Sequence, residues 1–131
     1  MDDWRFLHWE DSGGDAGLVA SQLLQRARDL VAFGWCQGVE ARDAAGLEVE
    51  PWSATACHWS LLGAIVASLD PPVTAAEESL PLSELALALA ALAEVVVEAS
   101  LAAWNDDALR SQAEVVRTLE QARAQLPSLG R

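Results

Sequence analysis

The sequence contains neither lysine nor tyrosine, so all eight of its basic residues are arginine. Its two cysteines are too few for a disulfide framework or for a zinc site made of four thiolates. The longest apolar run, residues 85–93, falls far short of the roughly 20 residues that a membrane-spanning helix requires. The first residues also lack the basic and apolar regions of a secretory signal peptide. We therefore expect a cytoplasmic protein with reduced thiols and no membrane segment.

Positive charge is scarce as well. The chain has 20 acidic and 8 basic residues, and its net charge is -12. Residues 51–109 contain eight acidic residues and no basic one. Because a negative surface repels phosphate, we expect no direct binding of nucleic acid. Such a surface could attract a basic protein, or imitate nucleic acid toward a protein that binds it. The simplest alternative is that the charge only keeps the protein soluble.

The length of 131 residues suffices for one hydrophobic core, and 52% hydrophobic residues exclude disorder over most of the chain. Bulky side chains near the start are followed by the turn-forming residues 12–15. We therefore predict an N-terminal arm over residues 1–15 and a single helical domain over residues 16–131.

Apolar residues at helical spacing predict four helices, over residues 16–34, 54–69, 84–104 and 112–126. Because the helix at 84–104 is apolar on most sides, we expect it to be the buried centre of the fold. Alternating residues around a turn predict a two-stranded β-hairpin over about 38–50. The predicted fold class is mainly α, with about four helices around 84–104 and this hairpin after the first helix.

Two motifs occur together in this chain. The first is GWCQG at residues 34–38, followed by ARD at 41–43 and a glycine at 46, and the second is WND at 104–106. This order resembles a family of small bacterial and phage-borne proteins of unknown function, over roughly residues 18–125. The resemblance implies a bacterial or phage origin and a largely helical fold, and it brings no activity. That family often has a cysteine where this chain has Ser60, whereas the second cysteine here is Cys57.

The residues that carry chemistry allow more than one interpretation. Cys36 could be a nucleophile, with His58 as its base and Asp106 orienting the base. The alternative is a buried structural cysteine, because neighbouring acids raise the pKa of a thiol. His58 falls on the apolar face of the predicted second helix, which favours a hydrogen-bonded core histidine. The spacing of cysteine and histidine fits no known zinc finger, so we predict no metal site, no cofactor and no catalytic set.

Seven residues from the two motifs and the predicted second helix could line a pocket between the first helix, the hairpin and the third helix: Trp35, Cys36, Gln37, His58, Trp104, Asn105 and Asp106. Four aromatic residues near loops could instead bind another protein if they are exposed together: Trp4, Phe6, Trp9 and Trp52. The alternative for the arm is that it covers the core. The leading hypothesis is a non-enzymatic acidic protein that binds another protein, such as a phage or host accessory factor. The competing hypothesis is a small-molecule-binding protein or small enzyme that uses the pocket.

Overall fold

A computed structural model describes the backbone of residues 3–69, 82–98 and 100–129. Within these ranges the chain forms five helices and one small sheet: α1 (Asp3–Phe33), β1 (Ala41–Arg42), β2 (His58–Trp59), α2 (Leu61–Ala67), α3 (Leu82–Val95), α4 (Leu101–Asn105) and α5 (Gln112–Leu129). A mainly helical fold with a small sheet after the first helix confirms the predicted fold class. Among these helices, none has the length and apolar character needed to cross a membrane.

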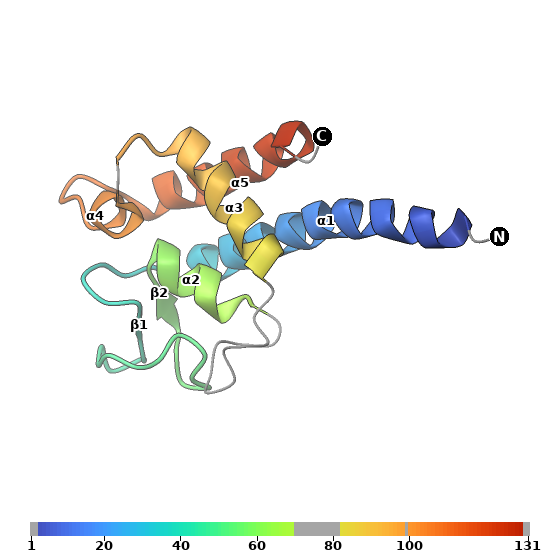
Figure 1. The fold of residues 1–131 in the computed structure, drawn as a ribbon. Coiled ribbons are helices and arrows are strands. Elements are labelled where there is room, and N and C mark those ends of the chain that lie inside the picture. Colours follow the sequence, from blue (N-terminus) through green and yellow to red (C-terminus); the bar gives the residue numbers. More distant parts are fainter. Residues whose placement is uncertain (1–2, 70–81, 99, 130–131) are drawn as a thin grey trace.

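The first helix is the element on which the others assemble. α1 packs against α2, α3 and α5, and Figure 1 shows these three helices gathered around its C-terminal half. One stripe of α1 is completely or almost completely buried, namely Ala20, Leu23, Leu24, Ala27 and Val31. These positions recur at the three- and four-residue spacing that places side chains on one helix face. The prediction that residues 84–104 form the buried centre of the fold is therefore corrected, because α1 occupies that central position.

α1 begins at Asp3 and continues without interruption through residues 12–15. A glycine inside a helix costs about 1 kcal/mol, which weakens a helix without ending it. The predicted arm is therefore helical from Asp3 onward, and Figure 1 shows this first part of α1 extending away from the other helices. The side chains of Trp4, Phe6 and Trp9 lie outside the described residues, so their role stays a prediction.

The predicted helix over residues 84–104 is divided in two. α3 ends at Val95, and α4 begins at Leu101 after Ser100, whose hydroxyl accepts a hydrogen bond from the backbone N–H of Ala103 at 3.1 Å. Residues 95–97 are three consecutive valines, whose β-branched side chains lower helix propensity. The Ser100 hydroxyl then accepts a hydrogen bond at the start of the new helix, where backbone N–H groups have no partner within the helix.

The small sheet pairs a different segment from the one predicted. β1 pairs antiparallel with β2, so that Ala41 lies opposite Trp59 and Arg42 opposite His58. The predicted partner around residue 48 forms one isolated bridge to Arg42, and Gly46 closes that turn with a φ of +86°. His58 consequently lies in a strand and not on the second helix. α2 begins only after Ser60, whose hydroxyl accepts from the N–H of Gly63.

The start of α5 follows the sequence prediction. The Ser111 N–H donates to the Glu114 carboxylate at 3.0 Å, and the Glu114 N–H donates to the Ser111 hydroxyl at 3.2 Å. This reciprocal pair satisfies two backbone donors at the helix start. The same helix buries one apolar face, which consists of Val115, Leu119, Ala122 and Leu126.

Candidate functional site

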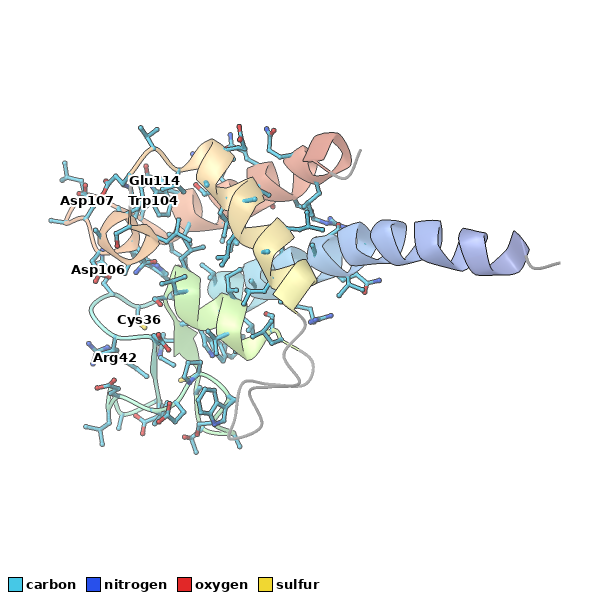
Figure 2. The ribbon with its side chains drawn as sticks, viewed as in Figure 1. Cys36, Arg42, Trp104, Asp106, Asp107 and Glu114 are labelled. Atoms are coloured by element: carbon cyan, nitrogen blue, oxygen red, sulfur yellow. The ribbon has the colours of Figure 1, made fainter. Side chains whose placement is uncertain are left out.

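The two sequence motifs meet at one end of the molecule, where α4 lies beside the loop that follows α1. Figure 2 shows Cys36, Trp104 and Asp106 at this end. Between them lies Asn105, the last residue of α4, which is 1% exposed. Its Oδ1 atom accepts hydrogen bonds from the Trp35 indole N–H at 2.8 Å and from the Leu61 backbone N–H at 3.1 Å.

The other side of the Asn105 amide is also occupied. Nδ2 donates to the Cys36 carbonyl at 3.2 Å and to the Asp106 carboxylate at 3.0 Å. An asparagine amide offers two donor and two acceptor positions, so this side chain is fully satisfied. Asn105 thereby ties α4 to the loop after α1 and to the first residue of α2.

Gln37 and Asp106 add a second layer to these contacts. The Gln37 amide donates to the carbonyls of Asn105 and Asp107 at 2.9 and 2.8 Å. The Asp106 carboxylate accepts from the Gly38 backbone N–H at 3.0 Å. We call the side chains of Trp35, Gln37, Asn105 and Asp106, with these contacts, the Asn105 network. Its polar groups face one another, which is the arrangement expected of a structural joint.

The ARD residues hold the neighbouring turn in the same way. The Arg42 guanidinium donates to the carbonyls of Gly46 and Gln37 at 3.0 and 3.3 Å. The Asp43 carboxylate accepts from the backbone N–H groups of Ala45 and Leu47, both at 2.9 Å. Both side chains are therefore engaged by backbone groups of their own loop.

The thiol of Cys36 is poorly placed for nucleophilic chemistry. It is 8% exposed, and its Sγ lies 3.6 Å from the Val39 carbonyl oxygen. Burial raises the pKa of the Cys36 thiol, Arg42 opposes this effect, and Asp106 adds to it. A raised pKa leaves little thiolate, which is the reactive form. No hydrogen bond among the described residues joins His58 to this thiol or to Asp106.

Because burial raises the pKa of the Cys36 thiol above its ordinary value of 9.0, this thiol should remain protonated in the folded chain where it ionises in the unfolded chain. Its contribution to stability is complete below the unfolded-state pKa and is lost as the pH rises through the folded-state pKa. We expect the free energy of unfolding to fall above about pH 9. Urea unfolding over a pH series should show a shallower fall for Cys36→Ala, and identical slopes would contradict this expectation.

Trp104 is part of the framework together with Arg110, which the sequence analysis did not identify. Trp104 is buried, and the Arg110 Cζ atom lies 3.9 Å from the centroid of its ring. The Arg110 Nε–H donates to the Trp104 carbonyl at 2.8 Å, and Nη1 donates to Glu114 at 3.4 Å. The four-residue spacing of Arg110 and Glu114 was the one signal for this position.

The space beside the Asn105 network is small. A recess of about 120 Å³ is lined by Gly38, Val39, Glu40, Ser60, Leu62, Ala102, Asn105 and Asp106. Pockets for drug-sized ligands have volumes of about 300–1,000 Å³. Of the seven predicted pocket residues, only Asn105 and Asp106 line this recess. The described residues also contain no group of three or more metal-ligating side chains.

A larger recess of about 320 Å³ lies between α1 and α5, away from the motifs. Its polar groups already have partners within the chain. Arg28 donates to Glu120 at 2.9 Å, and Arg123 donates to Ser21 at 2.9 Å and to Gln25 at 2.8 Å. These contacts join α1 to α5, and they indicate that the recess has a structural role.

Comparison with known proteins places the chain in a family. The model of a family described as "Family of unknown function (DUF6197)" matches residues 16–125. The chain belongs to this family. The matched region contains both motifs, and residues 1–15 lie outside it. Comparisons with curated proteins and with solved structures found no match. Family membership therefore assigns no chemistry to the site.

Proposed function

We propose that this chain is a non-enzymatic protein that binds another protein with a basic surface, as an accessory factor of a phage or its host. The observation that supports this most is a pair of exposed aromatic side chains, Phe33 and Trp52, which adjoin the buried Trp59 beside acidic loops. Phe33 is 76% exposed, and its ring centroid lies 6.4 Å from that of Trp59. The Trp59 indole donates to the Pro51 carbonyl at 3.0 Å, and the next residue, Trp52, is 41% exposed. We call Phe33, Trp52 and Trp59 the aromatic ledge.

The charge around the aromatic ledge favours a cationic partner. Glu48 and Glu50 are exposed in the segment between β1 and β2 that carries Trp52, Glu40 is exposed just before β1, and Arg42 is the only basic residue between positions 29 and 109. The Arg42 guanidinium is already engaged by two carbonyl groups, so it does little to attract an acidic partner. Exposed aromatic faces bind arginine and lysine through cation–π contacts, and tryptophan is enriched among residues that dominate binding energy.

A second group of exposed apolar residues supports the same proposal. Val97 is 96% exposed and Leu109 is 90% exposed. Each adjoins one member of the contact between Glu98 and Arg110, whose Oε2 and Nη2 atoms lie 4.0 Å apart. Exposed apolar side chains that lie together and are rimmed by polar residues mark surfaces that bind proteins.

The first part of α1 remains an additional candidate surface. It extends away from the other helices and carries Trp4, Phe6 and Trp9 in its sequence. A partner that uses this part would be affected by Trp4→Ala and Trp9→Ala, whereas a partner on the aromatic ledge would not.

The test compares an aromatic-ledge variant with a matched surface variant. Immobilised wild-type protein captures partners from a bacterial lysate, and the affinity of each purified partner is then measured. The double variant Phe33→Ala/Trp52→Ala should weaken binding by about 30-fold or more, the effect of losing roughly 2 kcal/mol from a hot spot. Leu18→Ala is the control, because Leu18 is 58% exposed on α1 and lies outside the aromatic ledge.

Two further results decide the proposal. Binding of a basic partner should weaken as the salt concentration rises, because salt screens exposed charges. If the partner normally binds DNA, duplex DNA should compete with this protein for it. An affinity that neither the double variant nor salt changes would overturn the proposed surface.

A further inference from the structure

Cys57 and His58 form a thiol–imidazole pair that the Asn105 network does not use. The Cys57 Sγ and His58 Nδ1 atoms lie 3.4 Å apart, within the reach of a hydrogen bond that involves sulfur. Both side chains are only partly buried, so small molecules in solution can reach them. A nucleophile and a base within hydrogen-bond distance are the basic requirement for nucleophilic chemistry.

The backbone fixes the position of this pair. The Cys57 N–H donates to the Arg42 carbonyl at 2.9 Å, and the Trp59 N–H donates to the Gly34 carbonyl at 3.0 Å. His58 lies between these two bonds, opposite Arg42 in the sheet. Its ring packs on Gly34, where an added Cβ would lie 3.0 Å from the imidazole Cδ2. The imidazole is thus held beside the thiol by the sheet and by close contact with Gly34.

We propose that Cys57 and His58 constitute a thiol–disulfide exchange site that accepts small, neutral disulfides. The Cys57 Sγ attacks one sulfur of the disulfide, a new S–S bond forms to Cys57, and the original S–S bond breaks. His58 Nδ1 accepts the thiol proton and passes it to the departing thiolate. The disulfide is the oxidant, and the products are a mixed disulfide on Cys57 and one free thiol.

The surroundings account for the preferred class of disulfide. Glu48 and Glu50 are exposed in the segment between β1 and β2 that also contains Cys57, and their charge disfavours anionic disulfides.

Cys36 supplies an internal comparison for this proposal. It is 8% exposed, and burial raises the pKa of its thiol. Nucleophilic attack requires an accessible thiolate, so Cys36 should react slowly in the folded protein. The two cysteines of one chain therefore differ in access to solvent and in the base beside them.

The experiment follows the reaction of the folded full-length chain with dithiodipyridine, a neutral aromatic disulfide, by the release of thiopyridone. One thiol per chain should react rapidly, and mass spectrometry should place the adduct on Cys57. Cys57→Ser should remove the rapid phase, whereas Cys36→Ser should retain it. His58→Gln should slow the rapid phase by about tenfold or more, because the adjacent base is lost. His8→Gln, at the other histidine of the sequence, should leave the rate unchanged.

Three results would overturn the proposal: an adduct on Cys36, a rapid phase that survives Cys57→Ser, or an unchanged rate in His58→Gln. Rapid labelling of Cys36 in a His58 variant would show that the substitution has loosened the fold. His58→Asn is then used in place of His58→Gln, and an unchanged Cys57 rate in that variant counts equally against the site.

Discussion

Replacing Asn105 with alanine should lower the free energy of unfolding by about 4 kcal/mol, because two buried polar groups and one partly buried group lose their partner at about 1–3 kcal/mol each. These groups are the Trp35 indole N–H, the Leu61 backbone N–H and the Cys36 carbonyl. Alanine offers neither a donor nor an acceptor in their place. Urea unfolding followed by circular dichroism measures the change.

Asp106→Ala is the matched control for this prediction. Asp106 belongs to the same network, but its side chain is exposed, so water can replace its bonds to Gly38 and Asn105. Its loss should cost about 1 kcal/mol, the net value of an ordinary hydrogen bond. If Asn105→Ala destabilised the protein no more than Asp106→Ala, the network would not be the joint described here.

Gly63→Ala should destabilise the protein by about 3 kcal/mol, the upper part of the range for an overpacked core. A Cβ at this position of α2 would clash with the backbone carbonyl of Glu40. Because that carbonyl also accepts a hydrogen bond from the Ser60 N–H, the loop cannot move away from α2 without breaking this bond. The loss exceeds the gain of roughly 1 kcal/mol that alanine brings to a helix.

Gly17→Ala makes the opposite prediction in the same kind of element. Gly17 lies in α1, and among the described residues no atom outside the adjoining helix backbone would come within 4 Å of an added Cβ. This variant should gain up to about 1 kcal/mol from helix propensity alone. In thermal unfolding, Gly17→Ala should therefore raise the melting temperature and Gly63→Ala should lower it. A higher melting temperature for both variants would show that α2 does not need its close contact with Glu40.

Local signals account for what the sequence predicted correctly. The apolar spacing that predicts the first helix and the last helix depends on residues three and four positions apart, and the structure contains both as α1 and α5. The sequence analysis also named Trp35 and Asn105 as candidates for one pocket, which stays a prediction. It did not show that the two side chains bond to each other, because they are 70 positions apart in the chain.

The incorrect predictions arose where a distant partner decided the structure. The residues before Ser60 have helical apolar spacing, but pairing with β1 places His58 in a strand. The apolar spacing likewise continues through residues 95–101, although the valines and Ser100 end one helix and start another. The contact of Arg110 with the ring of Trp104 likewise joins two residues that the sequence analysis did not connect. The spacing of apolar residues shows which face of an element is apolar. It does not show which distant backbone segment will pair with the same residues.

Hydrogen exchange at the indole N–H of Trp35 is the sharpest test of whether the two motifs form a closed network or an open pocket. The Trp35 indole donates to the buried Asn105, whereas Trp52 is exposed. In NMR spectra of the native chain, the Trp35 signal should exchange far more slowly than the Trp52 signal, and Asn105→Ala should abolish this protection. A Trp35 indole that exchanges as rapidly as that of Trp52 would show that the motifs leave an open site.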